Sequence, residues 1–152
     1  MTITFKEIDS SNYKKCSLLK VNDNQKDFVA PNWYSVLEAV YEKEEKHPYA
    51  IYHEEEMVGF LMFCYYPADD IYDKDSWWME RFMIAKDFQG KGYGKASLKK
   101  FIEDFQRDYP EEELRTSAVK ENHVAITLYE HSGFQRTGEF VEEEAVLLLE
   151  AE

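Results

Sequence analysis

Alternation of apolar and polar residues predicts a series of β-strands along the chain. Ile3, Phe5 and Ile8, with polar residues between them, are typical of a first strand. Two β-rich runs, residues 49–53 and 58–66, flank the polar Glu54-Glu55-Glu56 and together predict a hairpin. Further strands are expected at WWMERFMI, LRTSAV, FQRTGEF and EEAVLLLE, the last two pairing antiparallel.

A repeat of three to four residues predicts four helices between these strands. A short helix is expected over residues 13–21, and a second one begins after Pro31 with Asn32 as its N-cap. Pro48 forbids its continuation, and Pro110 likewise stops a long third helix. Gly133 suits the C-terminal end of a fourth, in NHVAITLYEHS. The apolar stripe of the second helix is Trp33, Val36, Leu37, Val40 and Tyr41, and that of the third is Leu98, Phe101, Ile102, Phe105 and Tyr109.

The order of these elements predicts an α/β fold of the α+β type. Most strands follow one another through short turns and are expected to pair antiparallel. The strand at WWMERFMI, the long helix and the strand at LRTSAV form a unit that must be a right-handed parallel crossover. We therefore expect a mixed, mostly antiparallel sheet with a central parallel strand–helix–strand unit and helices on both faces. No linker or repeat divides the chain, so residues 1–152 are expected to form a single domain.

Composition narrows the classes of function. The net charge of −13 argues against a nucleic-acid partner, because contacts with phosphates need a basic face. It fits a cationic partner, but taken alone it is better explained by an acidic surface that only keeps the protein soluble. No apolar run approaches the ~20 residues that span a bilayer, and no signal peptide opens the chain, so we expect a cytoplasmic protein without a membrane segment. Cys16 and Cys64 form no disulfide framework, and the four histidines have no metal-binding spacing, so no metal is expected.

A glycine-rich loop, QGKGYGK at residues 89–95, is the strongest chemical signal. Its glycines permit positive φ and close approach to a ligand, and the helix that follows adds a positive N-terminal end. The loop therefore suits a phosphate or a pyrophosphate. It matches neither the P-loop spacing nor the dinucleotide fingerprint, which would need a glycine where Lys95 stands. A tight turn without a ligand is the alternative reading of the loop taken alone.

The residues around this loop resemble the GNAT superfamily of acyl-CoA-dependent N-acetyltransferases. Residues 89–94 fit the pattern Q/R-x-x-G-x-G/A directly after a strand, and ENHVAITLYEHSGF is similar to a second segment of that family. The resemblance covers nearly the whole chain. The positions that carry the second segment are Asn122, Ala125, Leu128, Tyr129, Gly133 and Phe134.

This resemblance implies that acetyl-CoA is the cosubstrate. The backbone N–H groups of the loop would bind the pyrophosphate of coenzyme A, and the pantetheine arm would pair with a strand splayed away from its neighbour. Asn122 would contact the arm from the other side. The residues implied in cofactor binding are Phe82, Met83, Ile84, Gln89, Gly90, Lys91, Gly92, Tyr93, Gly94, Lys95, Asn122 and Tyr129.

Acetyl transfer to an amine needs a base for the ammonium, an acid for the leaving thiolate and a donor for the oxyanion. The resemblance gives Tyr129 the role of the acid; a core tyrosine with a satisfied hydroxyl is the alternative. Glu80 is the candidate base, because it lies in an apolar strand where burial is expected to raise its pKa. Its neighbour Arg81 should point to the opposite face by strand alternation. Glu80 could instead face solvent or pair with a lysine.

The acceptor amine is expected to be a polyamine. The segment MERFMI is similar to that of the bacterial spermine/spermidine acetyltransferases, and a polyamine needs spaced carboxylates and aromatic faces. We expect direct transfer in a ternary complex, by a homodimer in which AVLLLE pairs across the interface. Other amines and a non-catalytic CoA-binding regulator are the alternatives, and solvated charge runs are the alternative for the acidic residues. The candidate substrate-binding residues are Glu38, Tyr41, Asp69, Asp70, Trp78 and Glu80.

Overall fold

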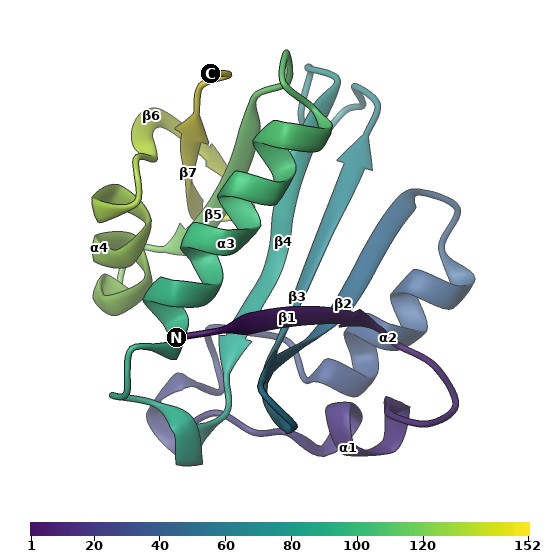
Figure 1. Ribbon diagram of the computed structural model, residues 1–152. Coiled ribbons are helices and arrows are strands. Elements are labelled where there is room, and N and C mark those ends of the chain that lie inside the picture. Colours follow the sequence, from purple (N-terminus) through teal and green to yellow (C-terminus); the bar gives the residue numbers. More distant parts are fainter.

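The strands and helices of the computed structural model, which describes residues 1–152, follow the expected order (Figure 1). Two short 3-10 helices, η1 and η2, add to the α-helices and strands. The elements are β1 (Ile3–Glu7), α1 (Tyr13–Leu18), η1 (Asp23–Gln25), α2 (Asn32–Tyr41), β2 (Glu45–His53), β3 (Glu56–Tyr66), β4 (Ser76–Ile84), η2 (Lys86–Phe88), α3 (Tyr93–Asp108), β5 (Leu114–Val119), α4 (His123–His131), β6 (Gln135–Val141) and β7 (Glu144–Leu149).

The seven strands form one mixed sheet in the order β1-β2-β3-β4-β5-β7-β6. Every neighbouring pair is antiparallel except β4 and β5, which are parallel and are joined through α3. The expected mixed sheet with one parallel crossover is therefore confirmed.

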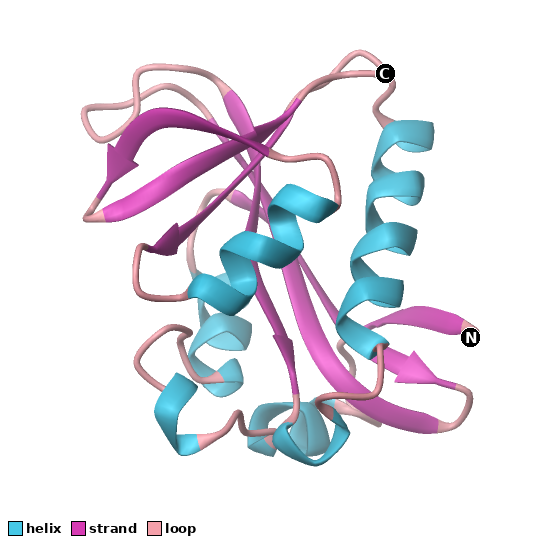
Figure 2. Cartoon of the chain, turned by 90° about the vertical axis from the view of Figure 1, so that its left-hand side faces the viewer, coloured by secondary structure: helices cyan, strands magenta, loops and turns pink.

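Each face of the sheet carries its own apolar core. Leu98 and Phe101 of α3 and Ile126 of α4 pack with the larger core on one face. Cys16 of α1 belongs to a second core, against which Val36 of α2 packs. Figure 2 shows α3 and the strands from the side, with α4 nearest the viewer. Helices thus cover both faces, as the sequence predicts.

The parallel pair β4–β5 is short, and this opens the sheet at its centre. The two strands pair only over Trp77–Met79 and Leu114–Thr116. At the end of the paired stretch the hydroxyl of Thr116 donates a hydrogen bond to the carbonyl of Met79 at 2.9 Å. Beyond Met79, β4 continues to Ile84 with a partner strand on the β3 side alone. Its other edge therefore offers unpaired main-chain groups to a ligand.

The second helix differs from its sequence prediction. Asn32 lies inside α2 and is buried, and its amide donates a hydrogen bond to the carbonyl of Cys16 at 3.0 Å; the N-cap position is Pro31. The expected stripe is mostly exposed: Tyr41 is 81% exposed. The buried face instead carries Asn32 and Ser35, because polar partners on β4 and α1 lie beneath this helix. The exposed members of the stripe are Trp33, Leu37, Val40 and Tyr41.

Two element boundaries also differ. The first helix ends at Leu18 instead of continuing to Val21. Strand β2 begins at Glu45 and includes Pro48, although the sequence places the proline outside any element. The pairing of β2 with β1 ends at Tyr49, so Pro48 has only β3 beside it.

The expected dimer contact through AVLLLE is not supported. These residues belong to β7, which pairs with β5 on one side and with β6 on the other. A strand paired on both sides has no free main-chain edge for a second copy. The hypothesis failed because the apolar run indicated a strand but not its place in the sheet.

Candidate active site

A cavity of about 560 Å³ opens where β4 separates from β5. Its walls come from Met79–Ile84 of β4, Thr116–Ala118 of β5, the glycine loop, α4 and the segment before α2. Lys91 and Lys95 belong to the loop but do not line the cavity. The remaining residues predicted to bind the cofactor all line it: Phe82, Met83, Ile84, Gln89, Gly90, Gly92, Tyr93, Gly94, Asn122 and Tyr129.

The glycine loop presents a run of free donors. Gly90 has φ 75° and Gly92 has φ 88°, a left-handed conformation that favours glycine. None of the backbone N–H groups from Gly90 to Lys95 donates a hydrogen bond to the protein. Six successive donors at the start of α3 form a site for a phosphate group. The loop therefore fits the pyrophosphate of coenzyme A.

Gln89 holds this loop in place instead of adding to the donors. Its backbone N–H already points to the carbonyl of Lys86 at 3.4 Å. Its side-chain amide donates to the carbonyl of Ile84 and to the side chain of Gln25, both at 2.8 Å, and its oxygen accepts from Asn22 at 2.9 Å. The free run thus begins at Gly90, one residue later than the sequence suggested.

The conformation of Gly92 provides a test of this site. Gly92→Ala places a side chain at positive φ, and we expect a stability loss of about 1 kcal/mol together with a roughly tenfold rise in the KM for acetyl-CoA. Gly138, at φ 84° in β6 and away from the cleft, is the matched control. Gly138→Ala should lose similar stability without changing that KM. Steady-state kinetics and thermal unfolding measure both, and equal KM values for the two variants would contradict the assignment.

Asn122 and Tyr129 enter the cleft from α4. Asn122 is the N-cap of this helix, and its side-chain oxygen accepts from the N–H of Ala125 at 3.4 Å. Tyr129 is 6% exposed. Burial raises the pKa of Tyr129 to about 12; the hydroxyl of Thr116 acts against this shift and the charge of Glu144 adds to it. The phenol therefore carries its proton at neutral pH and can donate it.

Glu80 occupies a β-bulge. In the pairing of β3 with β4, Met62 lies opposite Arg81 and Phe63 opposite Met79, so Glu80 has no partner of its own. The bulge breaks strand alternation. Arg81 consequently does not point to the opposite face, as the sequence had suggested. It reaches Ser35 and Glu38 of α2, on the same side as Glu80.

One oxygen of Glu80 accepts three hydrogen bonds from β2 and β3. The donors to Oε2 are the ammonium of Lys46 at 3.0 Å, the thiol of Cys64 at 2.8 Å and the phenol of Tyr66 at 2.7 Å. The side chain of Lys46 is 0% exposed and also donates to the oxygen of Tyr66. Of the alternatives to a catalytic role, pairing of Glu80 with a lysine is therefore observed, within a buried network.

The network reverses the expected pKa shift of Glu80. Burial by itself raises the pKa of this carboxyl, as the sequence argument assumed. Hydrogen bonds, first that from Cys64, and the charges of Lys46 and Arg81 outweigh burial and hold the pKa below its ordinary value. Glu80 is therefore an anion at neutral pH, with Oε1 facing Arg81 at 3.7 Å.

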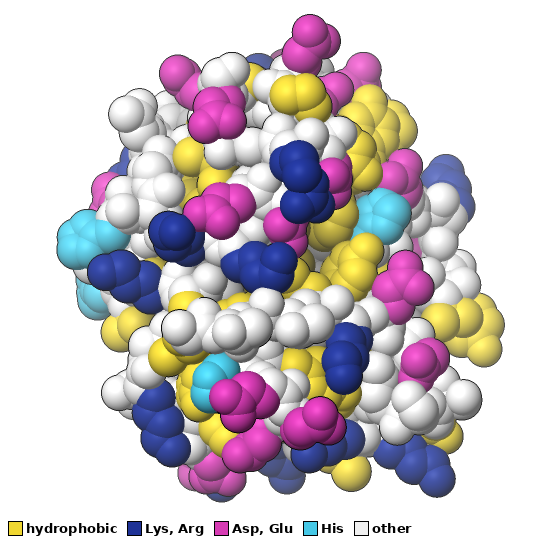
Figure 3. Space-filling view, in the orientation of Figure 1, with side chains coloured by type: hydrophobic (Ala, Val, Ile, Leu, Met, Phe, Trp, Pro, Cys, Tyr) yellow, Lys and Arg dark blue, Asp and Glu magenta, His cyan; other side chains and the backbone are white.

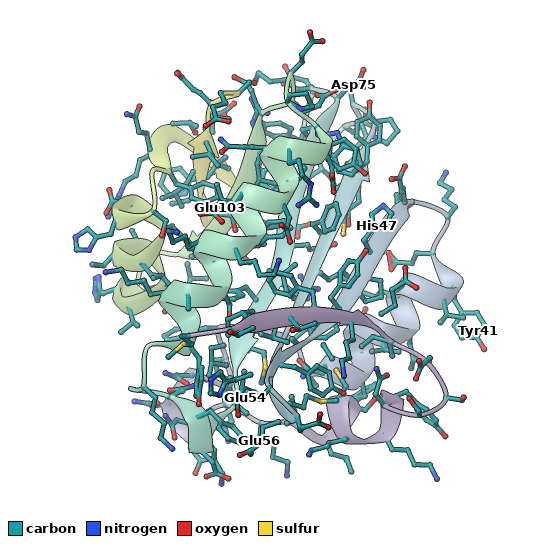
Figure 4. All side chains as sticks on the ribbon, in the orientation of Figure 1. Tyr41, His47, Glu54, Glu56, Asp75 and Glu103 are labelled. Atoms are coloured by element: carbon teal, nitrogen blue, oxygen red, sulfur yellow. The ribbon has the colours of Figure 1, made fainter.

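The other candidate substrate residues lie outside the cavity lining. Glu38 is bound to Arg81 at 3.2 Å. Asp69 caps its own turn through the N–H groups of Ile71 and Tyr72, and Asp70 is exposed on the same loop. Trp78 is buried, and its indole donates to Ser76. Tyr41 projects outward from the end of α2 (Figure 4). Only Glu80 of this set reaches the cleft.

The cleft contains two carboxylates that the sequence argument missed, Asp27 and Glu144. Asp27 lies in the segment before α2, and Glu144 is the first residue of β7. Both stand in acidic or polar runs that look solvated, so composition could not single them out. On the face seen in Figure 3, acidic and basic side chains are intermixed around apolar recesses.

Two further features of the structure concern metal ions and membranes. No group of three or more histidine, cysteine, aspartate or glutamate side chains is arranged to hold a metal ion. None of the helices has both the length and the apolar composition needed to cross a membrane.

Known proteins resemble this chain in sequence and in fold. Residues 9–134 match the acetyltransferase (GNAT) family. The chain is 34% identical to a probable spermine N(1)-acetyltransferase of Bacillus subtilis subsp. natto and 33% identical to the spermine/spermidine N(1)-acetyltransferase of B. subtilis strain 168, over 91% of each chain. An aminoglycoside acetyltransferase, AAC(6')-Ib, solved with paromomycin and acetyl-CoA, has the same fold, with a TM-score of 0.79, 17% identity and coverage of 99% of this chain and 94% of that one.

Proposed function

Since this chain belongs to the acetyltransferase (GNAT) family and is an N-acetyltransferase, we propose that it transfers the acetyl group of acetyl-CoA to a primary amine of a polyamine such as spermine or spermidine. The curated relatives named above support this acceptor. Transfer takes place directly, in a ternary complex, without a covalent enzyme intermediate.

The charge of the cleft is the observation that carries the proposal. Its charged lining residues are Asp27, Glu80, Arg81 and Glu144. The one cation among them, Arg81, already pairs with Glu38 and Glu80. Lys46 and Arg81 offset Glu80 and Glu38, whereas Asp27 and Glu144 form no ion pair and leave the cavity negative beside the glycine loop. Such a cavity attracts an acceptor with several ammonium groups and not a neutral or anionic one.

Acetyl transfer would then proceed by attack of the neutral amine on the thioester carbonyl carbon. The acceptor first loses one ammonium proton. After the new C–N bond forms, the nitrogen loses a second proton, which replaces the proton that Tyr129 gives to the sulfur. The C–S bond breaks, and the sulfur takes a proton from Tyr129, whose phenol is protonated at neutral pH. Main-chain N–H groups on the unpaired edge of β4 would stabilise the oxygen that becomes negative. The candidate donors are Phe82 and Ile84, because Met83 pairs with Phe60 and its main chain faces β3.

Glu80 would accept the ammonium proton through a water molecule. Its Oε2 atom is engaged by three donors, so Oε1 is the atom left for this role. A carboxylate with a lowered pKa is a weak base, but it is ionised over the whole neutral range and favours the approach of an ammonium. Lys46 and Arg81 on either side fix its position. Glu80 would therefore contribute to catalysis through its fixed position and its negative charge more than through its strength as a base.

A panel of amines tests the proposed acceptor. Enzyme and acetyl-CoA are mixed with spermine, spermidine, a monoamine, an aminoglycoside or a lysine-containing peptide, and the release of free thiol is followed. We expect kcat/KM for the polyamines to exceed that for the monoamine by about 100-fold, because the additional ammonium groups can form one or two further charge-assisted contacts. Faster turnover of the aminoglycoside or peptide would reject the polyamine assignment. Binding of acetyl-CoA without thiol release from any amine would indicate a regulator instead of an enzyme.

A further inference from the structure

Glu144 is held at a defined place on the rim of the open sheet. It pairs with Val119 at the end of β5 and with Val141 of β6. The turn before it contains Glu142 at φ 49° and Glu143 at φ 71°, a left-handed conformation that non-glycine residues seldom adopt. This strained turn starts β7 at the cavity and turns the side chain of Glu144 into it.

The side chain of Glu144 lies on the same face of the sheet as Glu80. Its Oε1 accepts a hydrogen bond from the hydroxyl of Ser117 at 2.8 Å. Ser117 alternates along β5 with Ala118, which belongs to the core beneath α3 and α4, so Ser117 and Glu144 face the other way. Glu80 faces that side too, bound to Cys64 of the second core. The two carboxylates therefore flank the gap between β4 and β5.

Glu144 is the carboxylate in this part of the cleft that has no cationic partner. Glu80 is bound to Lys46, and Arg81 is bound to Glu38. Glu144 forms no ion pair, and its second oxygen, Oε2, accepts no hydrogen bond from the protein. It is only partly exposed, and its charge acts on the Tyr129 phenol. A half-buried anion without a counter-ion is costly unless a cation binds there.

We propose that Glu144 binds an ammonium group of the acceptor and so sets the preference of the cleft for cationic amines. This inference rests on the proposed function. Ser117 positions the carboxylate, and Oε2 receives the ammonium, while Glu80 serves the reacting nitrogen from the opposite side of the gap. The acceptor would thus lie across the face of the sheet that carries α1 and α2, and acetyl-CoA would reach it from the side of α3 and α4.

The experiment compares Glu144→Gln with Glu143→Gln. Glu143 is the adjacent, exposed residue of the same turn, so both variants remove one negative charge at nearly the same place. For Glu144→Gln we expect kcat/KM for spermidine to fall about 10- to 100-fold, mainly through KM, the effect of losing one charge-assisted hydrogen bond. For Glu143→Gln we expect a change below about twofold. The KM for acetyl-CoA should be the same in both variants and in the wild type.

The possible outcomes separate the inference from the proposed function. If wild-type enzyme turns over no polyamine, the proposed function and this inference fall together. If the wild type acetylates spermidine and the two variants behave alike, the inference is wrong and the function stands. If Glu144→Gln also lowers thermal stability, the variant Ser117→Ala provides the deciding test, because it keeps the charge of Glu144 but removes the hydrogen bond that positions its carboxylate. An unchanged KM for spermidine in Ser117→Ala would overturn the proposal. A rise of a few-fold in that KM would support it.

Discussion

Tyr129→Phe is expected to lower kcat by about 100-fold and to leave the KM for acetyl-CoA within about twofold of wild type. The phenol is buried in the cleft at the end of α4, and its raised pKa of about 12 keeps the proton on the oxygen. Phenylalanine retains the packing of the ring against Phe134, so the fold should persist. Steady-state thiol release with saturating amine measures the effect.

Tyr109→Phe provides the control for this result. Tyr109 packs against Trp77 at the end of α3, outside the cleft, and its loss of a hydroxyl should leave kcat unchanged. The raised pKa also implies that kcat does not fall between pH 8 and 10 through ionisation of Tyr129. Equal rates for Tyr129→Phe and wild type would mean that another group protonates the leaving thiolate.

Lys46→Met is expected to cost about 3–5 kcal/mol of folding free energy, because it leaves the carboxylate of Glu80 without its buried counter-ion. The side chain of Lys46 is fully buried and reaches Glu80 at 3.0 Å. The control is Lys99→Met, which removes an exposed surface pair with Glu103 and should leave the folding free energy nearly unchanged. Chemical denaturation measures both. A double variant with Glu80→Gln should recover part of the loss, and full additivity would show that the two side chains are not coupled.

The same network predicts a pH dependence of stability. The folded-state pKa of Glu80 is lowered, so its contribution is present above the unfolded value of ~4.3 and is lost as the pH falls through the folded value. Lys46→Met raises the folded pKa and should shrink this contribution at neutral pH. Unfolding measured from pH 7 to pH 3 should then show a shallower acid-dependent decline in the variant than in the wild type.

Much of the site could be predicted from residues that act locally. Gly90 and Gly92 adopt positive φ, which glycine does at no steric cost because it lacks a Cβ atom. The loop that they form leads directly into α3, so its place at the start of that helix does not depend on residues distant in the chain. Tyr129 follows Asn122 by about two turns of one helix, so both reach the same cleft. The resemblance to the family singled out Asn122 and Tyr129, and their spacing along α4 accounts for why both line the cleft.

The acceptor side could not be predicted in the same way. Asp69 and Asp70 looked suitable by composition, but neither lines the cavity, whereas Glu144, which we propose for the acceptor, comes from β7 near the end of the chain. Its place depends on the register of β7 with β5, which no local pattern encodes. Likewise the bulge at Glu80 placed Arg81 on an unexpected face and brought Lys46 to the carboxylate.

The sequence by itself determined the strands, the helices and the glycine-rich loop before α3, because hydrophobic periodicity and glycine geometry act over a few residues. The tertiary structure alone decided where β4 leaves β5, which carboxylates face the gap and how the pKa of Glu80 shifts. Those properties depend on contacts between residues distant in the chain. Burial and charge in such contacts depend on the whole fold, and the identity of one residue does not reveal them.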